Sequence, residues 1–335
     1  MKKAYTYKCK ICGFPLVKAG KNDTGKQRYK CNKCNKRSVM KNDSKKKQNE
    51  LKLFVKWLID STKIVDKIDM SRSTFNRKTR WCWEIVPKIK SEGIPSDFIF
   101  ADATYLSGIN MCLLIARNDK YVLNFKWAKK ETYEDYLELF KPLDEPQFLI
   151  CDGHKSISKA AKKTWKNIGI QRCLVHVVHD VERRLGKKSH SEINHIFRRH
   201  IAKITKVDTA RKMKYWLNKF ERLCTEHKNY IEEETLKIDP DTGEVIGSFR
   251  THQKLFSVRN MINKLQKKNM LFLFLEHSIP NNSNYLEGGI NSPLKNLKRC
   301  HRGISLEHEK RMWEWYLLSR SNLSINDFIK SLDLN

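Results

Sequence analysis

Short apolar runs that begin at residue 97 restrict the folds that this chain can adopt. Three such runs follow one another closely and predict an antiparallel meander of strands in FIFADATYL, NMCLLIARN and YVLNFKWA. Helical spacing of apolar residues then predicts a helix in TYEDYLELFKPL. Two further strands, in QFLICDGH and at the start of IQRCLVHVVHDVERRL, alternate with helices. The predicted order is β-β-β-α-β-α-β-α.

An aspartate interrupts the first of these runs. Asp102 lies in the middle of a predicted buried strand, and a buried carboxylate is costly unless it is paired, hydrogen-bonded or bound to a metal ion. A candidate partner, Asp152, ends the fourth predicted strand. The order of elements is that of the ribonuclease-H-like architecture, in which these two strands are neighbours. We therefore expect the two aspartates to meet and to form part of a metal site.

A third acidic residue is expected, because two aspartates rarely complete a site for a pair of divalent ions. The candidate is Glu287, since asparagines precede it and Lys and Arg residues follow it, which predicts a polar and basic wall. Glu276, at the end of the apolar run LFLFLE, is the alternative. Carboxylates suit Mg²⁺ or Mn²⁺, and two such ions activate an attacking oxygen and stabilise a leaving one.

The charge of the chain indicates a polyanionic partner. Its 335 residues contain 67 Lys and Arg against 37 Asp and Glu, a formal net charge of +30. Neutralisation of phosphates by such residues drives nucleic-acid binding, so we expect double-stranded DNA as the partner, although a solvated basic surface is the alternative. The sequence has no apolar run of about 18 residues and no secretion signal at its N-terminus, so we expect no membrane segment and an intracellular protein.

Four cysteines near the N-terminus are spaced as metal ligands. Two Cys-x2-Cys pairs are separated by 18 residues, and four thiolates from two such knuckles can close a tetrahedral zinc site. An intracellular setting favours metal binding over disulfides. Residues 1–40 are therefore predicted to form a zinc ribbon, with structural Zn²⁺ bound to Cys9, Cys12, Cys31 and Cys34.

Residues 48–90 are predicted to form a helix-turn-helix DNA-binding domain. A first helix contains Leu51, a short second helix covers residues 64–68, and a third begins after Ser71 or Ser73 as N-cap. A basic final helix is typical of this motif and would enter the major groove, although a plain three-helix packing unit is the alternative. The predicted DNA contacts on it are Arg72, Arg77 and Lys78.

The rest of the chain is predicted to divide into three parts. Residues 96–178 form the first part of the ribonuclease-H-like core, residues 179–278 form an all-helical insertion with one hairpin-like break, and residues 279–335 close the core with the third acid. The fold class is thus a multidomain α/β protein. The basic residues after Glu287 would line the path of the DNA, and they are Lys295, Lys298, Arg299 and Arg302.

Several motifs give the chain a resemblance to a known family. They are ADATYL, CDGHKSI, QRCLVHV and NSNYLEGGINSPLKNLKRCHRG, with the predicted zinc ribbon before them. The chain resembles a bacterial insertion-sequence transposase of the DDE class, in the branch related to Mutator-type elements. The resemblance implies that Asp102, Asp152 and Glu287 are catalytic and hold Mg²⁺ or Mn²⁺.

The same resemblance draws attention to a Cys-x2-His motif, matched by Cys173 and His176. A structural or DNA-positioning role is expected for the pair, and a core histidine is the alternative for His176. His154 could contact a phosphate or cap a turn.

The expected activity is DNA transposition. The ribbon and the helix-turn-helix would hold the terminal repeats of the element, and metal-activated water would free a 3′-hydroxyl that attacks target DNA. Paired DNA ends require paired subunits, so a homodimer or a larger homo-oligomer is expected in the cytoplasm, at the nucleoid. The alternatives are a catalytically inactive DNA-binding regulator and a ribonuclease-H-like DNA nuclease.

Overall fold

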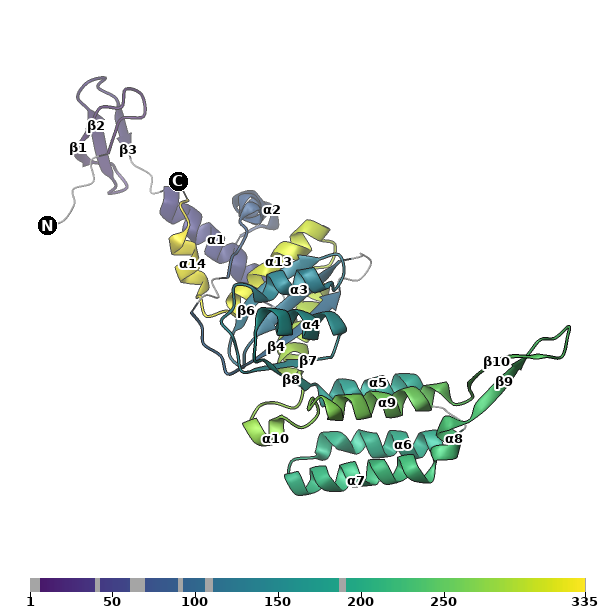
Figure 1. Cartoon of the computed structure of the whole chain (residues 1–335). Coiled ribbons are helices and arrows are strands. Elements are labelled where there is room, and N and C mark those ends of the chain that lie inside the picture. The colour runs from purple at the N-terminus through teal and green to yellow at the C-terminus, as the bar shows by residue number, and fades with distance from the viewer. Residues whose placement is uncertain are drawn as a thin grey trace. The chain divides into compact units, whose positions relative to one another are not determined.

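The computed structural model describes residues 7–39, 43–60, 70–89, 93–105, 111–186 and 191–334 (Figure 1). The chain divides into two compact units. The first is Met1–Trp57 with Ile68–Glu84 and Asn326–Asn335, and the second is Leu58–Lys67 with Ile85–Ile325. Within the described ranges, no helix is long and apolar enough to cross a membrane.

The first unit begins with a small antiparallel sheet. Its strands follow the order β1-β2-β3, with bounds Leu16–Lys21, Gln27–Cys31 and Arg37–Val39. Its core is small and consists of Cys9, Leu16 and Cys31, with Cys12 and Tyr29 packed against them. A core of this size buries little apolar surface, so a small domain of this kind usually needs a metal ion or disulfides to stay folded.

Helices follow in the first unit. Helix α1 (Asp43–Ile59) carries Phe54, whose ring meets Trp83 edge-on at 4.7 Å between centroids. Helix α2 (Arg72–Thr79) begins at the N-cap Ser71, whose hydroxyl accepts a hydrogen bond from the Thr74 amide. The predicted second helix of the helix-turn-helix, residues 64–68, lies outside the described residues. A short helix α14 (Ile325–Ser331) begins at the last residue of the second unit and otherwise belongs to the first.

The second unit is built on a mixed five-stranded sheet of order β6-β5-β4-β7-β8. Its strands are β4 (Phe98–Tyr105), β5 (Cys112–Arg117), β6 (Val122–Ala128), β7 (Phe148–Cys151) and β8 (Gly169–Arg172). The first three form the expected antiparallel meander, and β7 and β8 run parallel to β4. Helices α3 (Tyr133–Phe140), α4 (Lys155–Thr164) and α5 (Leu174–Leu185) fall between and after the strands in the predicted order.

Alternation along the strands separates the two faces of this sheet. One face packs on α3 and α4 (Figure 1) and buries Ile99, Ala101, Leu114, Leu149 and Cys151 with Tyr136, Phe140 and Ala160. The opposite face carries Trp127, which stacks on Trp313 at 5.9 Å between ring centroids. Trp313 belongs to the buried helix α13 (Leu306–Ser319). The sheet therefore lies between two layers of helix.

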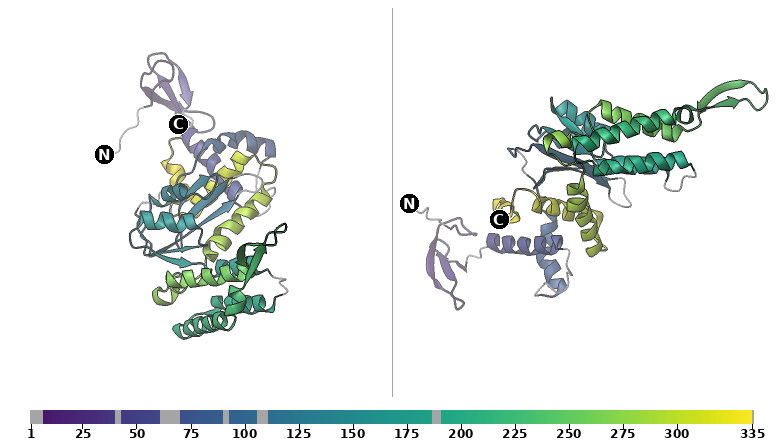
Figure 2. Two further views of the ribbon diagram at one scale, coloured as in Figure 1. Left: turned by 45° about the vertical axis from the view of Figure 1, so that its right-hand side comes forward. Right: turned by 90° about the horizontal axis from the view of Figure 1, so that it is seen from below.

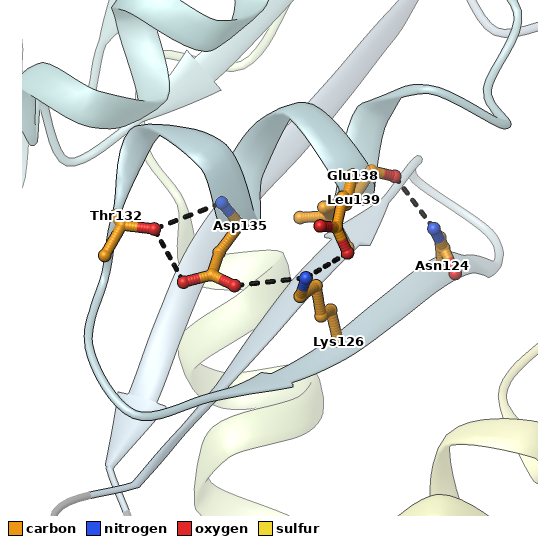
Figure 3. A network of polar contacts seen from close by, with 6 residues as sticks. All are labelled: Asn124, Lys126, Thr132, Asp135, Glu138 and Leu139. Carbon is orange, nitrogen blue, oxygen red and sulfur yellow. Dashed lines mark hydrogen bonds and ion pairs between the residues drawn. The ribbon is translucent and has the colours of Figure 1, made fainter.

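Polar contacts fix α3 against β6 (Figure 3). Thr132 caps the helix, since its hydroxyl accepts a hydrogen bond from the Asp135 amide at 3.1 Å. Lys126 on β6 pairs with Asp135 at 3.1 Å and with Glu138. Asn124 donates to the Leu139 carbonyl at 2.8 Å. The residue just before the cap, Glu131, accepts a hydrogen bond from the hydroxyl of Tyr105, the last residue of β4.

A helical region interrupts the sheet-forming part of the chain (Figure 2). After α5 come α6 (Glu192–Ala202), α7 (Ala210–Glu226), α8 (Lys228–Glu232), a hairpin of β9 (Glu234–Ile238) and β10 (Val245–Arg250), and α9 (Gln253–Lys267). The helices share a core of their own, which includes Phe197, Trp216, Phe220 and Val258. The hairpin lies in the predicted break.

The chain then returns to the sheet. Helix α10 (Phe274–His277) and the short α11 (Asn284–Leu286) lead into a π-helical turn, Glu287–Asn291, and into α12 (Ser292–Cys300) and α13. The arrangement is a mixed α/β unit with a helical region between β8 and these closing helices.

Candidate active site

Asp102 and Asp152 come together at adjacent strand positions. Ala101 on β4 pairs with Cys151 on β7 in parallel register. The residue that follows each of them is an aspartate, so the two aspartates lie side by side at the point where β7 ends. Ala101 and Cys151 face the core under α3 and α4, so both aspartates face the opposite side. Backbone amides hold one oxygen of each carboxylate: Ala103 donates to Asp102 at 2.9 Å and His154 to Asp152 at 2.8 Å.

The electrostatic environment of this pair favours the binding of a cation. Burial, together with the negative charge of Asp152, raises the pKa of Asp102 to about 7. His176 acts in the opposite sense and favours the charged form of Asp102. Two half-buried carboxylates that repel each other fit a divalent ion, because the ion neutralises both charges and takes hard oxygen ligands.

Glu287 is on a segment that crosses the same face of the sheet. Tyr285 stacks on Phe100 at 5.3 Å between centroids, and Phe100 shares a face of β4 with Asp102. Arg117 holds this segment, since its Nη1 donates to the Tyr285 carbonyl at 2.7 Å. The segment therefore brings Glu287 to the side of the sheet on which the aspartates lie.

The Glu287 carboxylate itself makes other contacts. Lys295 Nζ lies 3.5 Å from its Oε1, and Asn291 Nδ2 donates to its Oε2 at 3.0 Å. In the described part of the chain, three or more His, Cys, Asp or Glu ligand atoms come within metal-sharing distance only at the N-terminal cysteines. The structure thus brings Asp102 and Asp152 together and leaves Glu287 paired with Lys295, so its catalytic role stays a prediction.

The turn that carries Glu287 has a physical cause in the sequence. Pro293 has no amide hydrogen, so the Gly289 carbonyl lacks its usual helical donor. Tyr316 on α13 donates to that carbonyl at 3.4 Å instead. The Ser292 amide bonds to the Glu287 carbonyl, which gives the wider π-helical turn. Such turns occur often at functional sites because they change the direction in which one side chain points.

Glu276, the alternative third acid, lies at the other end of the sheet. Its neighbour His277 packs against Phe148 in a tilted arrangement, at 4.5 Å between ring centroids. Phe148 begins β7, and Asp152 follows the last residue of that strand. Four residues of extended chain span about 13 Å, so Glu276 is on the side of the sheet remote from the aspartates.

The Cys-x2-His motif connects the sheet to the segment before Glu287. Cys173 Sγ accepts hydrogen bonds from the amide and the hydroxyl of Ser283, both at 3.3 Å, and Ser283 Oγ lies 3.5 Å from His176 Nδ1. Burial raises the pKa of Cys173, but hydrogen bonds from His176 and Ser283 outweigh it and lower the value to about 7. The same contact with Cys173 raises the pKa of His176, which also senses both aspartates. Ser283 had no sequence signal of its own.

An arginine clamps the loop that carries Asp152. Arg172 ends β8 beside Cys151, and a Cβ added to Gly153 would lie 2.0 Å from its Cζ. Asp180 on α5 accepts from Arg172 Nη2 at 2.8 Å. Arg172 is buried, and within the described ranges its Nη1 has no hydrogen-bond partner. Gly153 is therefore required twice, for the close approach of Arg172 and for its own φ of +87°.

Around the aspartates lie two further groups, His154 and Glu131. His154 precedes α4 at the N-cap position without a side-chain capping bond, and its Nδ1 lies 3.8 Å from Glu131 Oε2. Glu131 accepts hydrogen bonds from the hydroxyls of Tyr105 and Tyr136, each at 2.9 Å. The negative charge of Glu131 contributes to the raised pKa of Asp102. Its sequence position, beside a helix start, did not distinguish it from the other acids there.

Most of the predicted DNA-contacting residues are exposed. Arg72, Arg77 and Lys78 are exposed on α2. Around α12, Lys295, Arg299 and Arg302 are exposed, while Lys298 pairs with Glu309 at 2.8 Å. A pocket of about 440 Å³ lies near the Glu287 turn, and its lining residues are Arg117, Lys120, Asn284, Tyr285, Gly289 and Arg320.

The four N-terminal cysteines form the second candidate metal site. Their sulfur atoms all lie within 4.8 Å of one another, with Cys9 and Cys34 3.5 Å apart and Cys12 and Cys31 3.4 Å apart. Tetrahedral Zn–S bonds of about 2.3 Å place sulfurs about 3.8 Å apart, so the cluster fits zinc. Amides of Cys12 and Ile11 point at the Cys9 sulfur and lower its pKa to about 6, which favours the thiolate that binds metal.

A protein-family model matches part of the chain. Residues 109–267 match the family model described as Transposase, Mutator family. The match confirms the resemblance to Mutator-related insertion-sequence transposases. The matched segment includes Asp152, Cys173 and His176, whereas Asp102 and Glu287 lie outside it. No curated protein matches the chain.

The Gly153 contact predicts opposite effects for two glycine substitutions. Gly153→Ala forces the Arg172 guanidinium or the Asp152 loop to move, and we expect a loss of about 2–4 kcal/mol in the free energy of unfolding. The matched control Gly288→Ala places its methyl in open space in a helical turn and should stabilise by up to about 1 kcal/mol. Urea denaturation measures both values, and equal stability of Gly153→Ala and the wild type would contradict the clamp.

Asp102 predicts a pH-dependent stability without added divalent ions. Because its folded pKa is about 7 and its ordinary value is 3.8, the folded state holds a proton that the unfolded chain releases between these values. This contribution lowers stability as the pH rises through that window. Asp102→Asn removes the cost, so it should exceed the wild type in unfolding free energy by about 4 kcal/mol at pH 8 and nearly match it at pH 4. A difference independent of pH would contradict this interpretation.

The cysteine cluster predicts bound zinc. Purified wild-type protein should contain one zinc ion per chain by elemental analysis, and Cys31→Ser should lose it because Cys31 is a buried member of the cluster. Cys224→Ser, on α7 and outside the cluster, is the control and should retain the zinc. Full zinc content in Cys31→Ser would show that the ion binds elsewhere.

Proposed function

We propose that this chain is a DDE-type DNA transposase that cuts the ends of its insertion element and joins them to target DNA. The observation that carries the proposal is the pair of aspartates on neighbouring strands, Asp102 within β4 and Asp152 directly after β7, in a chain whose residues 109–267 match the Mutator family of transposases. The strand order and the helices on both faces support a ribonuclease-H-like core, with the region from α6 to α9 as its helical insertion.

Asp102, Asp152 and Glu287 are the proposed ligands of the catalytic Mg²⁺ or Mn²⁺. When bound, such ions activate the attacking oxygen and stabilise the leaving oxygen of the phosphodiester. Asp102 would bind a cation in its charged form, and its raised pKa means that a bound cation would favour the loss of its proton. To serve as a metal ligand, the Glu287 carboxylate must separate from Lys295. Both side chains are more than half exposed, so Lys295 can turn to a phosphate of the DNA instead.

The remaining residues of the site position DNA and the acids. His176, whose pKa is raised by its hydrogen bond with Cys173, lies close enough to both aspartates to interact with their charges and is proposed to orient a backbone phosphate. His154, half-exposed beside Asp152, is proposed to contact the neighbouring phosphate. Lys295, Arg299 and Arg302 extend a basic surface from Glu287 along the proposed DNA path.

The first unit is proposed to bind the terminal repeats of the element. Zinc on Cys9, Cys12, Cys31 and Cys34 would stabilise the ribbon. The exposed residues of α2, Arg72, Arg77 and Lys78, would enter the major groove as the last helix of a helix-turn-helix. Two ends must be cut together, so a homodimer or a larger assembly in the cytoplasm, at the nucleoid, is proposed.

A catalytically inactive DNA-binding regulator is the second candidate. The observation in its favour is the Glu287–Lys295 pair, which leaves the third acid away from the two aspartates. A ribonuclease-H-like nuclease would share the acids and differ in the joining of strands. The test therefore has to separate binding, cleavage and strand transfer.

DNA cleavage assays give the decisive prediction. With Mg²⁺ or Mn²⁺, wild-type protein should nick DNA that carries the ends of the element and join those ends to a plasmid. Asp102→Asn, Asp152→Asn and Glu287→Gln should bind the ends normally and cut about 1000-fold more slowly, since each removes a metal ligand.

Glu276→Gln is the matched control, because Glu276 lies at the remote end of the sheet, and it should cut at the wild-type rate. Normal cutting by Glu287→Gln would move the third ligand elsewhere. Binding of the ends without cleavage by the wild type would favour the regulator, and cleavage without joining would favour the nuclease.

A further inference from the structure

The hairpin β9–β10 exposes an unusual amount of apolar surface. Fourteen large apolar side chains are exposed among the described residues, and five of them are on this hairpin: Leu236, Ile238, Val245, Ile246 and Phe249. Each of these five side chains is more than half exposed. Contiguous exposed apolar surface in a protein usually marks an interaction site, because its exposure to water is costly.

The register of the hairpin gathers three of these side chains on one face. Val245 pairs with Ile238, so their side chains point to the same face, and Leu236 follows two residues away on that face. Phe249 pairs with Thr235 and lies on the other face. Figure 1 and the right-hand view of Figure 2 show the hairpin projecting beyond the helices to which it is attached. An isolated two-stranded hairpin is marginally stable in water, so contact with a partner would stabilise it.

The root of the hairpin is held firmly, in contrast to its outer part. Arg250 pairs with Glu234 at 3.1 Å and lies over the Phe256 ring at 5.0 Å from the centroid. Thr235 and Thr251 share a hydrogen bond of 2.7 Å between their hydroxyls. These contacts fix the direction in which the hairpin leaves α8 and α9, so its apolar face is presented and not folded back.

The charge of the hairpin identifies the kind of partner. Its turn contains Asp239, Asp241 and Glu244 and no basic residue, and residues 234–250 as a whole have four acids against two bases. DNA would repel such a turn. Residues 191–232, in the helices beside it, have ten Lys and Arg against five Asp and Glu. The acidic turn is therefore complementary to the basic helical region of another copy of the same chain.

We propose that the β9–β10 hairpin is a dimerisation arm that binds a second copy of this chain. The two arms pack against each other through Leu236, Ile238 and Val245 around a two-fold axis, and the acidic turn of each faces the basic helices of its partner. The inference names the surface that pairs the subunits and rests on the proposed function only for the need to pair them.

Sedimentation velocity of the full-length protein without DNA tests the arm. The wild type should be a dimer, and Leu236→Ser with Ile238→Ser should raise the dimer dissociation constant at least about tenfold, because the variant removes the central apolar contacts. Both positions are exposed in the single chain, so the far-UV circular dichroism of the variant should match that of the wild type and show that it folds. The matched control, Val86→Ser with Tyr121→Ser, removes two exposed apolar side chains elsewhere and should dimerise as the wild type.

A charge variant tests the partner surface. Asp241→Lys with Glu244→Lys should also weaken the dimer, and added salt should then strengthen it, whereas salt should weaken the wild-type dimer. A monomeric wild type at all concentrations would overturn the proposal, as would an arm variant that dimerises normally. Loss of DNA binding by the arm variant with an unchanged dimer would assign the arm to DNA and overturn it as well.

Sedimentation velocity of the catalytic variant, together with the cleavage assay, separates this proposal from the catalytic one. Asp102→Asn should remain dimeric while it fails to cut DNA, because the aspartate pair and the arm are on different elements. Failure of cleavage in the wild type would therefore leave the dimer result standing, and a monomeric wild type would leave the metal site to be judged by its own assay.

Discussion

The repulsion between Asp102 and Asp152 is the constraint around which the second unit is organised. Parallel pairing of β4 with β7 forces the two carboxylates to one edge of the sheet, where burial makes the charged form of Asp102 unfavourable. A folded protein keeps such a costly arrangement where a bound cation offsets it. The backbone amides of Ala103 and His154 hold one oxygen of each aspartate, so the carboxylates are oriented before any ion binds.

The surrounding structure fixes these acids in place. On the β8 side, Arg172 presses on Gly153 and is held by Asp180, which fixes the loop after β7. On the other side, Cys173 and His176 grip Ser283, and Tyr285 stacks on the sheet, so the returning chain must pass over the aspartates. The helical region between β8 and α10 is large, yet these contacts at both of its ends hold the segment with the Glu287 turn against the sheet.

The two units solve the stability problem in different ways. The second has an extensive apolar core on both sides of its sheet and in its helical region. The ribbon of the first unit has a very small apolar core, and its four clustered cysteines take the place of a larger core. The hairpin arm has neither, which is consistent with a surface completed by another chain.

The sequence alone predicted the order of strands and helices, the pairing of Asp102 with Asp152 and the four-cysteine cluster. These follow from local periodicity, from the cost of a buried charge and from ligand spacing, all of which are properties of short segments. Only the tertiary structure revealed the contacts of Ser283 with Cys173, of Arg172 with Gly153 and of Glu131 with His154. Each contact joins residues that are distant in the sequence, and no local sequence pattern indicates which distant residues will meet. The pairing of Glu287 with Lys295 was likewise decided by the π-helical turn, whose geometry depends on a proline and on a tyrosine from another helix.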